Sequence, residues 1–108
     1  MEEKLRESLE RIVHAMERYV EFKVLVKAEA VEEKLVLEAG ELVFYTREPN
    51  VSQRPLAALR RMLLRVLRVH HKDIELERSR RGESIIVRVR GLGPEEVVKR
   101  LMDAVEVG

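Results

Sequence analysis

The sequence predicts an α+β fold, a two-layer sandwich in which a mixed β-sheet carries its helices on one face. Two observations predict it. Apolar residues recur at helical spacing in some segments and at a spacing of two in others, and loops rich in Gly, Pro or polar residues separate these segments. The expected order is α-β-β-β-α-β-β-α, and runs of strands with helices laid on one face give two packed layers.

The first predicted element is an amphipathic helix that runs from Glu2 to about Val20. Its apolar residues at helical spacing are Leu5, Leu9, Ile12, Val13, Met16, Tyr19 and Val20. From Phe22 to Ala28 the apolar period changes to two, which predicts a strand. We therefore divide the chain into an N-terminal amphipathic helix extension, residues 1–20, and an α+β domain, residues 21–108, which together have the length of one compact domain.

The next elements are two strands, a loop and a second helix. Lys34–Glu38 and Glu41–Arg47 are the strands, and Ala39-Gly40 between them is expected to form a tight hairpin turn, because Gly tolerates positive φ. The run from Glu48 to Pro55 contains two prolines and several polar residues, so we expect a loop there. Pro55 suits the first turn of a helix, which we expect to end at about His70.

The last predicted elements are a hairpin and a helix. The strands of the hairpin are Asp73–Ser79 and Ser84–Arg90, and its turn is Arg80-Arg81-Gly82. Gly91 to Pro94 breaks the pattern again, and Pro94 opens a final helix that we expect to end near Val105.

The composition narrows the class of protein. The chain has no Cys, so it has neither a disulfide framework nor a thiolate metal site. Charged residues make up 38% of it, and only Asn50 and Gln53 carry side-chain amides, a pattern typical of proteins from hyperthermophiles. The first residues are charged and no long apolar run follows. We therefore expect a cytoplasmic protein without a signal peptide or a membrane span.

The net charge of +1 conceals an uneven distribution along the chain. Residues 1–48 carry 8 Lys or Arg and 12 Asp or Glu, a net charge of −4. Residues 49–90 carry 11 and 4, a net charge of +7, and residues 91–108 carry 2 and 4, a net charge of −2. The middle of the chain is therefore basic, and both ends are acidic.

The best candidate for a functional site is a basic stripe on the second helix. The stripe consists of Arg54, Arg61, Arg65, Arg68 and Lys72. These positions fall within an arc of roughly 60° at 100° per residue, opposite the apolar face. No acidic residue occurs from Pro49 to Lys72, so the stripe has no carboxylate partner on its own helix. Because Arg binds phosphate bidentately, the stripe predicts a polyanion partner; the alternatives are a solvated face or pairing with the acidic first helix.

A second basic cluster lies at the end of the predicted hairpin. It consists of Arg78, Arg80 and Arg81. Such a tip would fit a groove of RNA, and the alternative is a turn that only improves solubility. We expect Arg88 and Arg90 of the next strand to be structural. In the predicted register Glu75 opposes Arg88 and Asp73 opposes Arg90, which are ordinary cross-strand ion pairs.

Neither a metal site nor a catalytic site is predicted. Adjacent residues on a helix point about 100° apart, so His70-His71 would be a poor chelate, and we expect His70 to be buried or half-buried on the apolar side. His14 lies at helical spacing from Glu10 and Glu17, a set that a surface ion-pair cluster explains better. The chain shows no recognisable nucleophile–base set, phosphate loop or Gly-rich fingerprint, and we expect no cofactor.

From about Phe22 to Leu101 the order of motifs resembles the YggU-like family, uncharacterised proteins that contain domain of unknown function 167. The matching pieces are Glu48-Pro49-Asn50-Val51, Arg54, Ala58-Leu59, Ile74-Glu75-Leu76, Val87-Arg88-Val89-Arg90-Gly91 and Glu95-Glu96-Val97-Val98. The resemblance implies the same kind of α+β domain. It implies no activity, because the family's own role is not established. Of the polar signature positions in the family's loop and turn, this chain keeps only Arg54 in kind.

We therefore expect a non-enzymatic binding module that associates with RNA or a ribonucleoprotein through the basic helix face and the Arg-rich hairpin tip. The chain has only two Tyr and two Phe, so a base-stacking platform is not expected, and contacts should be to the RNA backbone and its shape. The alternative is a protein–protein adaptor or a homo-oligomer that uses the N-terminal helix or a sheet edge.

Overall fold

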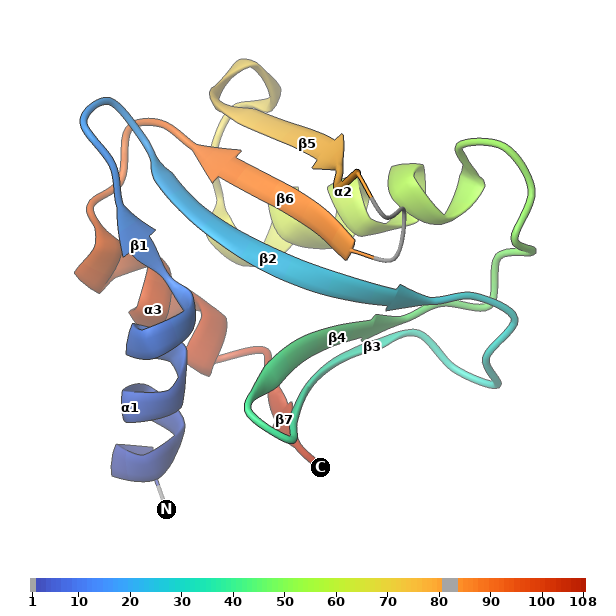
Figure 1. Cartoon of the computed structure of the whole chain (residues 1–108), viewed down its shortest axis with the longest axis horizontal. Helices are drawn as coiled ribbons and strands as arrows, with labels where there is room; N and C mark the ends of the chain where they lie inside the picture. Colours follow the sequence, from blue (N-terminus) through green and yellow to red (C-terminus); the bar gives the residue numbers. More distant parts are fainter. Residues whose placement is uncertain (1, 81–83) are drawn as a thin grey trace.

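The computed structural model of the chain describes residues 2–80 and 84–108. It confirms the predicted α+β sandwich, in which α2 and α3 pack on one face of a mixed, open sheet (Figure 1). The elements in chain order are α1 (Glu2–Ile12), β1 (His14–Ala15), β2 (Val20–Lys27), β3 (Lys34–Glu38), β4 (Glu41–Tyr45), α2 (Arg54–Leu67), the 3₁₀ turn η1 (His71–Asp73), β5 (Ile74–Arg78), β6 (Ser84–Val89), α3 (Pro94–Met102) and β7 (Glu106–Val107).

The sheet is built around β2, its longest strand. The strand order is β5-β6-β2-β4-β3-β7, and β1 pairs with the start of β2. β2 runs parallel to β4, and β3 runs parallel to β7, whereas the other neighbouring strands are antiparallel. The short strands β1 and β7 add to the order predicted from the sequence, and β5 lies at one edge of the sheet.

The prediction of one helix from Glu2 to Val20 is wrong beyond Ile12. α1 ends there, and β1 follows it and pairs with β2. The Met16 N–H donates a hydrogen bond of 2.9 Å to the Tyr19 carbonyl, which closes the turn between β1 and β2. Pairing with the sheet satisfies the backbone of this segment and overrides its helical spacing, so Met16 is 45% exposed rather than packed on a helix face.

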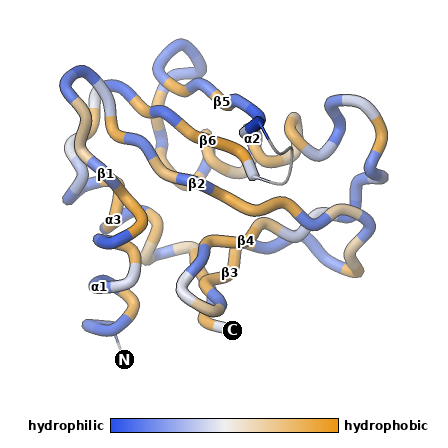
Figure 2. Tube along the Cα trace, in the orientation of Figure 1, coloured by the Kyte–Doolittle hydropathy of each residue, from blue (hydrophilic) through white to orange (hydrophobic). Residues whose placement is uncertain are grey.

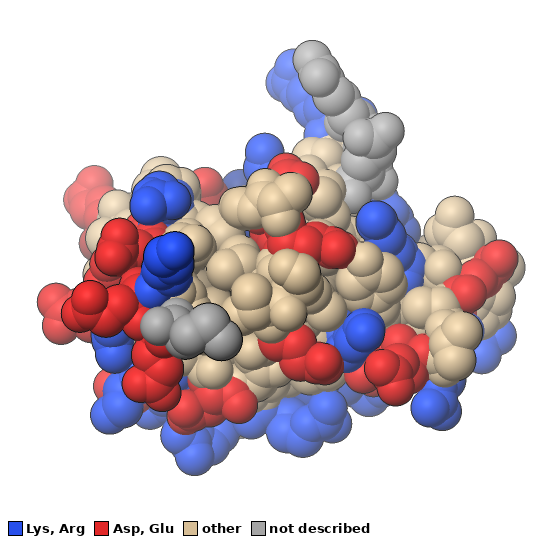
Figure 3. Space-filling model, turned by 90° about the horizontal axis from the view of Figure 1, so that it is seen from below, with Lys and Arg blue, Asp and Glu red and all other residues tan. Residues whose placement is uncertain are grey.

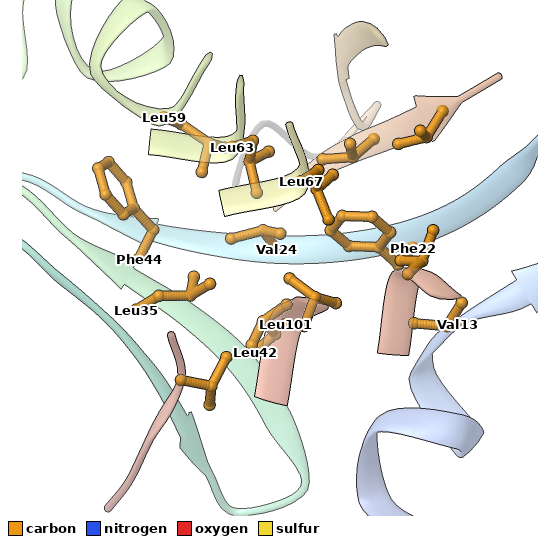
Figure 4. Packing of buried hydrophobic residues seen from close by; sticks show 14 of the residues in the cluster. Val13, Phe22, Val24, Leu35, Leu42, Phe44, Leu59, Leu63, Leu67 and Leu101 are labelled. Atoms are coloured by element: carbon orange, nitrogen blue, oxygen red, sulfur yellow. The ribbon is translucent and has the colours of Figure 1, made fainter. Parts of the chain in front are cut away.

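The core lies between the sheet and the helices (Figure 4). Alternate residues of β2, including Phe22 and Val24, point into it, and the hydropathy of the chain alternates along this strand (Figure 2). Leu63 of α2 and Leu101 of α3 pack into the same cluster. α1 contributes Leu9, which is fully buried, and packs against α3. The predicted N-terminal extension is therefore part of the common core.

The predicted hairpin turn between β3 and β4 is confirmed. Ala39 and Gly40 have φ angles of 52° and 75°, and two successive positive values are typical of the type I′ turn that suits the twist of a hairpin. β4 ends at Tyr45 rather than at the expected Arg47. Similarly, α3 ends at Met102, short of the expected end near Val105.

The predicted end of the second helix at His70 is too late. α2 ends at Leu67, and Arg68 turns the chain with a left-handed φ of 54° while its N–H donates to the Leu64 carbonyl at 3.0 Å. His70 is exposed, and the expectation of a buried histidine is wrong, because the chain has left the helix before this residue. Its Nδ1 accepts a hydrogen bond from the Lys72 N–H at 3.3 Å, at the start of η1.

Candidate nucleic-acid interface

α2 turns opposite faces to the core and to solvent. Leu59, Leu63 and Leu67 are fully buried and fix the rotation of the helix about its axis. Arg54, Arg61 and Arg65 of the basic stripe therefore lie on the solvent side of α2, as the helical wheel predicts. The prediction of one continuous helix face is wrong for the other two members, because α2 ends at Leu67: Arg68 is its left-handed cap, and Lys72 lies in η1. The members of the stripe, Arg54, Arg61, Arg65, Arg68 and Lys72, are all exposed.

Among the residues that the structure describes, four of the five stripe residues carry no ion pair. Within residues 2–80 and 84–108, no carboxylate pairs with Arg61, Arg65, Arg68 or Lys72. Arg54 differs, because its Nε donates to the Glu48 carboxylate of the preceding loop at 3.0 Å. The unneutralised part of the stripe thus runs from Arg61 to Lys72.

Other arginines near α2 have a visible structural role. Arg60 is half-buried, and its Nη1 donates to the Ile74 carbonyl at 3.3 Å, which ties α2 to β5. Arg100 of α3 donates to the Leu67 carbonyl at the end of α2, where a cation also interacts favourably with the helix dipole. The side chains of Arg61, Arg68 and Lys72 donate to no described group, so the fold does not account for them.

α1 carries four Glu and three Lys or Arg and packs against α3 (Figure 1), and none of its described carboxylates pairs with the stripe. The carboxylate of Glu96, on α3, interacts electrostatically with Arg68 of the stripe. A hydrogen bond of 2.9 Å from Arg100 lowers the pKa of Glu96, and the charges of Arg100, Lys99 and Arg68 lower it further. Glu96 therefore lies within the field of Arg68, but its hydrogen bond is made to Arg100.

The surface charges are unevenly distributed along the chain and mixed on part of the surface. Seen from below, Lys and Arg side chains occur along the lower rim of the molecule, whereas Asp and Glu side chains are most numerous at the left but also lie across the rest of this face (Figure 3). The stretch from Pro49 to Lys72, which contains α2, has no acidic residue. A polyanion that approaches the helix layer from the α2 side meets mainly positive side chains.

The hairpin tip contributes one residue whose role the sequence analysis missed. Arg80 is exposed, as expected for a tip, whereas Arg81 lies outside the described residues. Arg78 follows Ile74 and Leu76 in the alternation of β5, which places it on the helix-facing side of the sheet. There it lines a hollow of about 180 Å³ beside the start of α2. The alternation was the available signal, but the hollow depends on how β5 and α2 pack.

The structural role expected for Arg88 and Arg90 is confirmed with different partners. Glu75 opposes Arg88 in the register as predicted, but Arg88 pairs with Glu77 at 2.6 Å and with a β2 carboxylate at 3.0 Å. These hydrogen bonds raise the pKa of Arg88. Arg90 pairs with Glu75 at 3.7 Å rather than with Asp73. The two pairs between β5 and β6 are therefore diagonal, whereas the carboxylate of β2, that of Glu21, lies directly opposite Arg88.

Two findings on the structure and one comparison with known families follow. In the part of the chain that the structure describes, no group of three His, Asp or Glu side chains is arranged to hold a metal ion. None of the described helices is long and apolar enough to cross a bilayer. No family model matches the chain, so the resemblance to the YggU-like family stays a prediction.

Proposed function

We propose that the protein is a non-enzymatic binding module that associates with RNA or a ribonucleoprotein through the basic stripe, with help from the Arg-rich hairpin tip. One observation carries the proposal. Arg61 and Arg65 are exposed on one face of α2, Arg68 is exposed at its C-terminal cap, and none of the three has an ion-pair partner among the described residues. Like charges at this spacing destabilise a helix by a few tenths of a kcal/mol, roughly, so a partner that neutralises them explains their arrangement.

The geometry suits a phosphate backbone. At about 1.5 Å of rise per residue, Arg61 and Arg68 are separated by roughly 10 Å along the helix axis, so the stripe offers several successive contacts rather than one. Each guanidinium can bind a phosphate with two parallel hydrogen bonds. Phe22 and Phe44 are buried in the core, which leaves them unavailable to stack on bases.

Charge reversal tests the proposal. Arg61→Glu combined with Arg65→Glu should abolish binding to a short RNA at low salt, because it replaces two phosphate contacts by repulsion. Lys4→Glu combined with Arg6→Glu is the matched control, since it makes the same change of net charge at exposed positions of α1. If wild-type protein has no measurable affinity for RNA, or if both double variants lose affinity equally, the stripe is not an RNA-binding site.

The alternative is a protein–protein adaptor or a homo-oligomer. The structure removes one support for it, because the apolar residues of α1, such as Leu9, are used in the protein's own core. The other support remains: β5 is an edge strand, and its outer backbone groups are open to a further strand. Static light scattering distinguishes the two, since a monomeric mass over a range of concentrations excludes self-association.

A further inference from the structure

Two hollows lie next to each other along the first half of α2, and we call the pair the groove. The first, of about 180 Å³, is lined by residues that include Asn50, Leu56 and Arg78. The second, of about 370 Å³, is lined by Leu56, Ala57, Arg60 and Arg61 among others. Leu56 belongs to both hollows, so they meet at this residue. The groove thus leads from the end of β5 to Arg61, where the unneutralised part of the basic stripe begins.

The floor of the groove is mainly apolar around Leu56 and Ala57, in the second hollow, whereas the first hollow is mainly polar. In the first hollow Ile85 and Pro55 are buried, so besides Leu56 its accessible apolar side chains are those of Val26 and Ala28, which are half-buried. Leu56 is half-buried and continues this floor along α2. Such a surface contacts an apolar, flat group better than it contacts water. The second hollow alone falls within the range of roughly 300–1,000 Å³ that small-ligand sites occupy.

A positively charged side chain lies at each end of the groove, Arg78 at one end and Arg61 at the other. Arg78 is exposed and pairs with no carboxylate in the described part of the chain, whereas Arg88 of the neighbouring strand pairs with two. Arg61, at the other end, is also without an ion pair there. Asn50 adds an amide that can both donate and accept hydrogen bonds. The groove therefore combines an apolar floor with two positive ends, which complements a ligand with flat apolar groups and repeated negative charges.

We propose that this groove binds single-stranded RNA, with unpaired bases on the floor formed around Leu56 and phosphates at Arg78 and Arg61. The proposal rests on the proposed function and specifies its substrate class. In a duplex the bases are stacked inside the helix and cannot reach such a floor, whereas unpaired bases can be splayed onto a protein surface. The floor is aliphatic and offers no aromatic ring for stacking, so it contacts a base only through apolar burial, which does not distinguish one base from another.

Two neutral substitutions test the groove separately from the stripe. Arg78→Gln removes the charge at one rim, and Ala57→Gln places a longer side chain in the groove at an exposed helix position without adding charge. Arg6→Gln on α1 is the control for Arg78→Gln. Affinity is measured for a short single-stranded RNA and for a duplex of the same sequence, and an unchanged melting temperature shows that each variant is folded.

The outcomes separate the two proposals. If the groove binds single strands, wild-type protein prefers the single strand to the duplex, and both groove variants lower single-strand affinity about tenfold while duplex affinity stays close to that of Arg6→Gln. If wild-type protein binds RNA in a salt-dependent way but neither groove variant weakens single-strand binding, the groove proposal is overturned and the stripe stands. If wild-type protein binds neither RNA, both proposals are overturned.

Discussion

The salt dependence of RNA binding tests whether the unpaired cations of the stripe act on phosphates. Each phosphate that a cation neutralises adds roughly −0.7 to the slope of log K against log salt concentration for a single strand. The four stripe residues without ion pairs among the described residues are Arg61, Arg65, Arg68 and Lys72. Together they should give a slope of about −3, so that affinity falls roughly 50-fold between about 50 and 200 mM salt.

Two matched substitutions make this prediction specific to the structure. Arg65→Gln should reduce the magnitude of the slope by about 0.7. Arg54→Gln removes the same charge from the same helix, but Arg54 is already paired with Glu48 at 3.0 Å, so the slope should change by less. Fluorescence anisotropy with a labelled single-stranded RNA over a salt series measures the slope for wild type and for each variant. A wild-type slope near zero, or equal changes for the two variants, would refute the reasoning.

Three substitutions test the packing, the turn and one ion pair. Leu9→Ala removes a fully buried side chain and should lower the free energy of unfolding in urea by about 3 kcal/mol, whereas a loss below about 1 kcal/mol would show that α1 is not part of the core. Ala39→Asn should raise that free energy by roughly 0.5 kcal/mol, because Asn tolerates the φ of 52° better than Ala does, and a lower melting temperature would contradict this. Arg100 lowers the pKa of Glu96 in the folded state, so the ionised carboxylate stabilises the protein above the ordinary pKa of 4.5, and this contribution disappears as the pH falls through the lower, folded pKa. Glu96→Gln should therefore be less stable than wild type at neutral pH and equally stable in acid; a stability difference that does not change with pH would rule out this role.

The parts of the fold that were predictable are those fixed by local chemistry. Apolar and polar residues alternate along β2, and apolar residues share one face of α2, so each element has one buried side. Gly40 marks the turn between β3 and β4, because Gly adopts positive φ easily. The ends of the helices were not predictable in the same way. α1 stops at Ile12 because His14 and Ala15 pair with the start of β2 in a short hairpin, and this pairing overrides the helical spacing of the apolar residues.

In the candidate site, too, some features follow from the local sequence and others depend on tertiary contacts. The exposure of Arg61 and Arg65 follows from the rotation of α2, which its own apolar residues determine. The pairing of Arg54 with Glu48 depends on the path of a loop, and the hollow beside Arg78 depends on the packing of β5 against the start of α2. Neither juxtaposition is encoded in a short stretch of sequence, so each needed the tertiary structure.

The net charge of +1 is a poor guide to the partner of this protein, because the charges are unevenly distributed along the chain. Opposite charges cancel for an approaching ligand only when they lie within a screening length, about 8 Å at physiological ionic strength. α1 carries several of the chain's acids and packs against α3, while α2 turns its basic stripe away from the core to solvent. Glu96 of α3 lies within the field of Arg68, but no described carboxylate pairs with Arg61 or Arg65, so their charges are not cancelled by an ion pair. A polyanion at α2 would respond to this local excess of positive charge and not to the balance of the whole chain.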